Sequence, residues 1–343
     1  MKKLLNTLYI TTPERYLSLD GETVVIRQED TEIAKIPLHN LERIMTFGYT
    51  GASPALMGKC AKDGIELVFM SRSGKFLARV EGETNGNVLL RREQYRIADN
   101  DERSLDISKK IIAAKLYNTR WSIERTIRDH SLRIDTEKFK NKSRFLQESI
   151  NKAINARNIG ELRGIEGEGA SVYFSIFDDM ILQQKNEFFF RGRNKRPPLD
   201  NVNAMLSFAY SLCTGMCASA LESAGLDSYV GFMHTDRPGR KSLALDLVEE
   251  FRCLMCDRFV LTAINKRLMN NDDFIKREDG AVIMTDNGRR NFLAAWQNKK
   301  QDEIKHPFLN EKVQWGMIPY VQALLLTRFI RGDLDCYPPF FWK

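Results

Sequence analysis

The chain has 343 residues, of which 43% are hydrophobic and 28% are charged, so disorder is excluded as its main state. This length is enough for two domains, because a domain usually has about 100–200 residues. Lys and Arg number 52 against 45 Asp and Glu, and the formal charge of +7 favours an anionic partner. No stretch approaches about 18 unbroken apolar residues, so no membrane span is expected.

The cysteines and the N-terminus bear on the compartment. Six cysteines at irregular spacing do not form a disulfide framework, which favours a reducing cytoplasm. Residues 1–5 resemble the start of a signal peptide, but Asn6 and Thr7 interrupt the apolar run and no small-residue cleavage site follows. We therefore expect a soluble, cytoplasmic protein.

Roughly the first 95 residues predict a β-rich domain. Alternating apolar residues predict strands over residues 16–19, 23–26, 33–36, 65–69 and 75–80. Asp20-Gly21 is a favourable turn between the first two strands, and Ser73-Gly74 is a turn before the last one. Ser53 and Pro54 predict the start of a helix that ends near Asp63-Gly64.

The apolar period changes after about residue 100. Ile107, Ile111 and Ile123 recur at helical intervals without Gly or Pro, which predicts a long helix over residues 106–127. Further helical segments are separated by Gly, Pro and Asn around residues 191–200, 235–240 and 270–288. The sequence thus predicts an α+β protein, with a small β-rich N-terminal domain (residues 1–98) followed by a larger all-α domain (residues 99–343).

Positive charge is concentrated in one helical segment. Between Ser108 and Phe145 there are 11 Lys and Arg against four acids, a surplus equal to that of the whole chain. A solvated helical face would explain this pattern. The four Arg and Lys in the following loop, residues 191–196, favour contacts with nucleic-acid phosphates instead.

A first candidate site surrounds His234. It is followed by turn residues and then by a predicted helix, residues 242–251, in which Asp246 and Glu249 lie three apart on one face. Two acids among leucines and valine are typical of a partly buried metal site. The alternative is a pair of surface acids near a helix N-terminus, where the helix dipole favours them.

A second candidate is the glycine-rich segment Arg163–Phe174. Gly164, Gly167 and Gly169 are unfavourable in a helix, by roughly 1 kcal/mol each relative to Ala. They would be explained if a ligand approached the backbone near Glu166 or Glu168. A flexible loop between helices explains them equally well, and the spacing does not decide.

Together these residues suggest a hydrolytic or transfer reaction on phosphodiesters. A neutral imidazole with two carboxylates suits Mn²⁺ or Mg²⁺, which would polarise a phosphodiester held in a basic groove. Two cysteine pairs, at residues 213 and 217 and at residues 253 and 256, are most simply core residues. The tail, residues 337–343, has four aromatic residues that either pack back onto the protein or dock on a partner.

Several segments, in this order, carry a family resemblance. They are residues 47–57, 86–92, 163–167, 196–208, 231–234, 245–252, 331–335 and 337–339. The chain resembles the CRISPR-associated Cas-one endonuclease/integrase family nearly end to end, and most closely its type I-C branch.

The resemblance implies a role for each domain and for four residues. The β-rich domain would form a homodimer, and the helical domain would hold Mn²⁺ or Mg²⁺ with Glu166, His234 and Glu249. Glu166 rather than Glu168 matches the family acid, and Glu249 stands where other branches carry Asp. Asp246 matches a second family acid, which we assign a supporting role as an outer-shell or alternative ligand.

The resemblance also implies a reaction and partners. The 3′-hydroxyl of captured DNA would attack the CRISPR repeat boundary in a metal-dependent transesterification, and water could replace the hydroxyl. The family works with the small companion Cas-two, and this branch often with a Cas-four nuclease. A general nuclease that never integrates and a non-enzymatic nucleic-acid scaffold remain as alternatives. The metal used in the cell, the repeat sequence and the length of captured DNA are left open.

Overall fold

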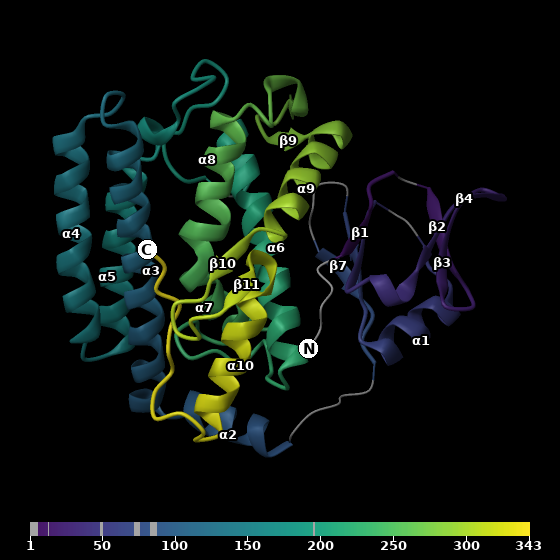
Figure 1. Ribbon diagram of the computed structural model, residues 1–343, viewed down its shortest axis with the longest axis horizontal. Helices are drawn as coiled ribbons and strands as arrows, with labels where there is room; N and C mark the ends of the chain where they lie inside the picture. The colour runs from purple at the N-terminus through teal and green to yellow at the C-terminus, as the bar shows by residue number, and fades with distance from the viewer. Residues whose placement is uncertain (1–5, 13, 49–50, 72–75, 83–87, 195) are drawn as a thin grey trace.

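The computed structural model describes residues 6–12, 14–48, 51–71, 76–82, 88–194 and 196–343. A small β-rich part lies beside a larger helical part (Figure 1). The predicted turn at Ser73-Gly74 lies outside the described residues.

The β-rich part contains two sheets. Strands β1 (Thr7–Ile10), β5 (Arg43–Phe47), β6 (Glu66–Met70) and β7 (Phe76–Arg79) form one sheet in that order, parallel except for β7. Strands β2 (Arg15–Asp20), β3 (Thr23–Gln28) and β4 (Thr31–Pro37) form an antiparallel meander, followed by a 3₁₀ turn at Leu38–Asn40. Each predicted strand is present to within two residues of its expected bounds, whereas β1 and β5 were not predicted.

Local signals explain the hairpin and the helix of this part. Asp20 pairs with Thr23, so Gly21 lies in the turn, with the positive φ of 55° that favours glycine. Helix α1 (Pro54–Asp63) begins at Ser53, whose hydroxyl accepts a hydrogen bond from the Leu56 amide at 3.2 Å. It ends at Gly64 in the left-handed conformation, as predicted.

Strand β5 is buried along its whole length because both faces of its sheet are covered. One face carries Ile44 and Leu67 into a core shared with the meander and α1. The other face carries Met45 and Phe47 into the helical core, where the ring centroids of Phe47 and Phe208 are 6.1 Å apart. Successive side chains of β5 therefore pack into two different cores, and the strand connects the β-rich part with the helical part.

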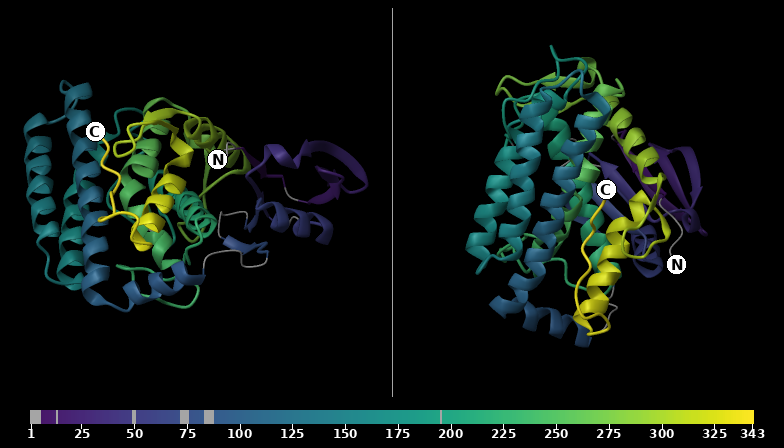
Figure 2. Two further views of the ribbon diagram at one scale, coloured as in Figure 1. Left: turned by 60° about the horizontal axis from the view of Figure 1, so that its bottom comes forward. Right: turned by 60° about the vertical axis from the view of Figure 1, so that its left-hand side comes forward.

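The helical part is built from long helices. They are α2 (Val88–Ala98), α3 (Asp101–His130), α4 (Thr136–Ile154), α5 (Ile159–Phe174), α6 (Asn201–Ser223), α7 (Ser242–Phe251), α8 (Arg258–Asn265), α9 (Asp286–Lys300) and α10 (Ile318–Ile330). Helices α3, α4 and α5 pack side by side, and α3 also packs against α7 (Figures 1 and 2). The predicted helix over residues 106–127 forms most of α3, and its Ile107, Ile111 and Ile123 are buried.

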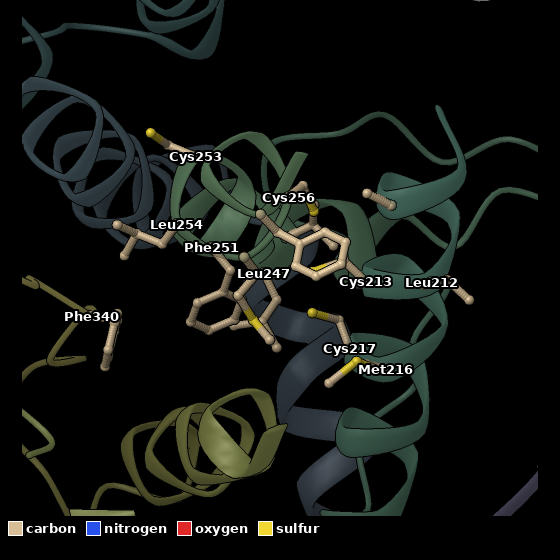
Figure 3. Close-up of a cluster of buried hydrophobic side chains, with 14 of the residues drawn as sticks. Leu212, Cys213, Met216, Cys217, Leu247, Phe251, Cys253, Leu254, Cys256 and Phe340 are labelled. Carbon is tan, nitrogen blue, oxygen red and sulfur yellow. The ribbon is translucent and has the colours of Figure 1, made fainter. Parts of the chain in front are cut away.

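Helix α6 lies in the hydrophobic core. Among the described helices it alone is long and apolar enough to cross a membrane, but 67% of its most apolar window is buried inside the protein. Cys213 and Cys217 of α6 lie near Cys256 and Phe251 in this core (Figure 3). All six cysteines are described and free, and the prediction that both cysteine pairs belong to the core is confirmed.

Short elements complete the helical part. The strand pairs are β8 (Phe274–Lys276) with β9 (Val282–Met284) and β10 (Glu303–Lys305) with β11 (Lys312–Gln314), and 3₁₀ turns lie at Asp178–Met180, Asn271–Asp273 and Trp315–Met317. A π-helical turn, Arg252–Asp257, links α7 to α8. Three-residue strands are too short to show an alternating pattern, so they were not predicted. The predicted fold class is confirmed, while the boundary at residue 98 and the dimerising role of the first domain stay predictions.

Candidate metal centre

The loop before α7 places His234 against that helix. The buried carboxylate of Asp246 accepts hydrogen bonds from Nδ1 and from the backbone N–H of His234, at 2.6 and 3.0 Å. Its second oxygen accepts from the backbone N–H groups of Phe232 and Met233, at 2.6 and 3.0 Å. Because a carboxylate accepts, Nδ1 carries a proton, and in the neutral imidazole Nε2 is the nitrogen left to bind a metal ion. We call residues 231–234 together with Asp246 the His234 clasp.

Glycine at position 231 is required by the close approach of this loop to α7. A Cβ at Gly231 would lie 2.8 Å from Cβ of Ser242, 2.9 Å from its carbonyl carbon and 2.9 Å from Oδ2 of Asp246. These distances are shorter than van der Waals contact. The absent side chain therefore allows the loop to reach the Asp246 carboxylate.

The glycine-rich segment is helical, so the expectation of a flexible loop there is wrong. It forms most of α5, and Gly169 faces α3, where a Cβ would lie 2.5 Å from Cδ2 of Leu116. Glycine at this position lets α5 and α3 pack closely. The Glu166 side chain, 23% exposed, faces α3, whereas Glu168 is exposed.

Lys115 of α3 lies between two of the candidate ligands. Its ammonium forms an ion pair with the Glu166 carboxylate and lies 2.5 Å from Oε2 of Glu249. Lys115 is only 7% exposed. The prediction that the cations of the basic segment contact phosphates is therefore wrong for Lys115, because its ammonium faces two acids inside the protein.

Glu249 is buried and ionised. Burial alone would raise the pKa of its carboxyl, but the charges of Lys115 and Arg252 outweigh burial and lower that pKa to about 2. Arg252 donates to Oε1 of Glu249 at 2.9 Å and stacks on Tyr210, 4.6 Å from its ring centroid. Asp246 and Glu249 are both buried, so the alternative of two surface acids is wrong.

Arg163 connects α5 to the loop that carries His234. Its guanidinium donates to the Met233 carbonyl and, at 2.9 Å, to Oγ1 of Thr235. These two residues flank His234 in the chain. Because positions three apart share one face of a helix, Glu166 lies one turn from this attachment. Helix α5 thus brings Glu166 toward the His234 clasp.

The four predicted site residues form two linked pairs. Glu166 and Glu249 meet at Lys115, and His234 is bound to Asp246 one turn before Glu249 on α7. Among the described residues, no three His, Cys, Asp or Glu side chains already lie close enough to enclose a metal ion. The donor set fits a hard divalent cation, because two carboxylates converge on one positive charge and a neutral imidazole presents Nε2.

A buried polar network anchors the C-terminal tail beside this centre. Glu250 accepts hydrogen bonds from the Tyr337 hydroxyl at 2.5 Å, the Phe340 amide at 2.8 Å and Nε2 of Gln322 at 3.0 Å. Burial raises the pKa of Glu250 to about 7 despite these hydrogen bonds. Asn118 of α3 donates to the carbonyl groups of Glu250 and Phe340. The tail therefore packs on the protein and connects α3 with α7.

We expect Tyr337→Phe to lower the free energy of unfolding by about 1–3 kcal/mol, because it removes a donor from a buried carboxylate. Chemical denaturation of the purified protein measures this loss. Tyr95→Phe is the matched control, because the Tyr95 hydroxyl donates to Asp227 at 2.9 Å but Tyr95 is exposed. Equal losses for the two variants would show that the tail network contributes no special stability.

The rest of the basic segment is divided between ion pairs and exposed charge. Several of its cations pair with acids of the same surface, as Arg125 and Arg128 do with Asp129 and Lys138 does with Asp179. Lys140 and Arg144 of α4 are exposed. Contact of these exposed charges with phosphates stays a prediction.

Sequence reasoning missed the partners of the site residues. Lys115 was counted as a surface charge, and Arg163 and Arg252 were given no role. One signal was available for Lys115, which lies four residues after Ile111 and therefore on the buried face of the predicted helix. Arg252 lies three residues after Glu249, a spacing that brings an acid and a base together on a helix. Arg163 has no comparable signal, because its partners Met233 and Thr235 lie in a distant loop.

The fold is similar to that of two solved structures. A casposase solved with its integration product superposes with a TM-score of 0.84 at 21% identity, over 99% of this chain and 95% of the casposase. The chain of a Cas6-RT-Cas1–Cas2 complex matches with a TM-score of 0.82 at 20% identity, over 100% of this chain and 36% of that chain. At these identities the likeness establishes the fold alone.

Sequence comparison identifies the family. The family model for CRISPR associated protein Cas1 matches residues 8–298, and the chain belongs to this family. It is 47% identical to CRISPR-associated endonuclease Cas1 1 of Chlorobaculum tepidum over the full length of both proteins. It is 34% identical to a CRISPR-associated exonuclease Cas4/endonuclease Cas1 fusion of Geobacter sulfurreducens, over 97% of this chain and 60% of the fusion. The predicted Cas-one resemblance is confirmed.

Proposed function

We propose that this protein is a divalent-metal-dependent CRISPR integrase that joins the 3′-hydroxyl of captured DNA to the CRISPR repeat. The observation that carries the proposal is the pair of carboxylates, Glu166 and Glu249, facing one cation beside the clasped His234. Relatives named endonucleases support phosphodiester chemistry. The casposase solved with an integration product supports strand joining over hydrolysis alone.

The proposed reaction exchanges one phosphodiester for another. The attacking 3′-oxygen forms a bond to a phosphorus at the repeat boundary, and the bond from that phosphorus to its own 3′-oxygen breaks. The attacking hydroxyl loses a proton and the leaving oxygen gains one, so no covalent protein intermediate is needed. Mn²⁺ or Mg²⁺, held by Glu166, His234 and Glu249, would polarise the phosphate and stabilise its negative charge. Asp246 fixes the orientation of the His234 imidazole.

The proposal includes partners and a compartment. We assign the β-rich part to a homodimer and the exposed cations of α4 to DNA phosphates. The Cas2 of a structurally similar complex and the Cas4 of a fused relative support the predicted companions. Six free cysteines fit a reducing cytoplasm.

A strand-joining assay tests this function. The full chain is mixed with the companion Cas2, a labelled DNA with free 3′-hydroxyls and a plasmid carrying the repeat, in Mn²⁺, Mg²⁺ or chelator. We expect joined product with either ion and none with chelator, and a loss of at least about 100-fold for Glu166→Gln and for His234→Ala. Glu168→Gln is the matched control, because this exposed acid lies two residues away.

Each alternative gives a different result in this assay. DNA with 3′-dideoxy ends cannot join, so it separates strand joining from cleavage. Metal-dependent cleavage without joined product would indicate a general nuclease. Product that is unchanged in Glu166→Gln and His234→Ala would indicate that these residues hold no catalytic ion.

A further inference from the structure

Lys115 supplies a positive charge to the interior of the candidate metal centre. Its ammonium is paired with Glu166 of α5 and lies 2.5 Å from Oε2 of Glu249 of α7, and the residue is 7% exposed. Two carboxylates this close repel each other unless a cation lies between them or one of them takes up a proton. Lys115 removes that repulsion without any metal ion.

A divalent ion held by Glu166 and Glu249 would need the oxygen atoms that Lys115 now contacts. Two cations at the same oxygens repel each other, and this repulsion is strong where water is excluded. The lysine stem is long and flexible, so its ammonium can withdraw while α3 keeps its place. Arg252 would remain on the other oxygen of Glu249, where it donates at 2.9 Å.

We propose that Lys115 is an internal counter-ion of the metal-free centre, which stabilises the two carboxylates when no divalent ion is bound and competes with that ion for them. Lys115 is thus a positioning residue that sets the metal affinity of the site. This inference rests on the proposed function, because it assumes that Glu166 and Glu249 hold the ion.

Metal binding without DNA tests this role. Binding of Mn²⁺ to the full-length protein is measured by electron paramagnetic resonance at pH 8, together with the melting temperature in chelator. We expect Lys115→Met to bind Mn²⁺ about tenfold more tightly than the original protein, because a competing charge is gone. Its metal-free form should melt at a lower temperature, and Mn²⁺ should raise that temperature more than it does in the original protein.

The matched control removes the same charge from the same helix. Lys110 of α3 pairs with the exposed Asp106, so Lys110→Met should leave the affinity for Mn²⁺ unchanged. An unchanged or weaker affinity in Lys115→Met would overturn the proposal. If the original protein binds no Mn²⁺, or Glu166→Gln and Glu249→Gln bind it normally, the proposed function fails as well.

A second measurement uses the original protein, in case Lys115→Met does not fold. Lysine labelled with nitrogen-15 gives an ammonium signal for Lys115, assigned by its loss in Lys115→Arg. We expect Mg²⁺ to shift this signal, because the ammonium leaves both carboxylates, and to leave the Lys110 signal in place. A Lys115 signal that does not respond to saturating Mg²⁺ would show that the two cations do not compete.

Discussion

Asp246→Asn is expected to lower the free energy of unfolding by about 3–5 kcal/mol and strand joining by about 10–100-fold. The carboxylate accepts four hydrogen bonds, from Nδ1 and the backbone of His234 and from the backbones of Phe232 and Met233. An asparagine has only one accepting oxygen, and its NH₂ group would face N–H donors. The imidazole would then lose its fixed orientation. Denaturant unfolding and the strand-joining assay measure the two effects.

Asp236→Asn is the control for this prediction. Asp236 lies in the same loop and accepts from the Gly231 amide at 3.3 Å, but it is exposed. We expect its change in stability to stay within about 0.5 kcal/mol, as for most surface substitutions. If Asp246→Asn unfolded at the same denaturant concentration as Asp236→Asn, the carboxylate would not hold the loop.

Gly231→Ala is expected to have the second large effect, a loss of about 1–3 kcal/mol in stability together with a fall in strand joining. The new methyl group would lie 2.9 Å from both the Ser242 carbonyl carbon and Oδ2 of Asp246, so the loop must move away from α7. Gly215→Ala is the control, because a Cβ at this helical position meets no described atom within 4 Å. Alanine there should be neutral or stabilising, since it favours the helix.

The double variant Asp246→Asn with Gly231→Ala tests whether both act on the His234 clasp. Each substitution alone is expected to separate the loop from α7. A second substitution then removes few further contacts between them. We expect the combined loss in stability to be smaller than the sum of the single losses, by at least about 0.5 kcal/mol. Additive losses would mean that the two residues stabilise the protein independently.

Local sequence signals predicted the secondary structure well. The Asp20-Gly21 turn, the Ser53 cap and the apolar period of α3 each depend on residues close in the chain, and all three are confirmed. Strand β5 was missed because it is buried on both faces, which removes the alternation that marks a half-buried strand.

The candidate centre was less predictable, because its contacts join distant parts of the chain. Spacing alone did not separate Glu166 from Glu168, and the choice came from the family resemblance. The structure adds that Glu166 faces Lys115, which lies 51 residues earlier. Glycine at 169 was interpreted as a sign of ligand or loop, but it serves helix packing against Leu116. Helix-breaking residues are ambiguous until the neighbouring element is known.

The tail network affects the order in which a newly synthesised chain can mature. Glu250 obtains its hydrogen bonds from Tyr337 and from the Phe340 amide, 87 and 90 residues further along the polypeptide. A ribosome adds about 5–20 residues per second, so α7 exists for several seconds before these donors emerge. During that interval Glu250 lacks the two hydrogen bonds that the tail donates. A nascent chain therefore completes this network only after residues 337–340 have been translated, and a product that stops before them leaves Glu250 without both donors.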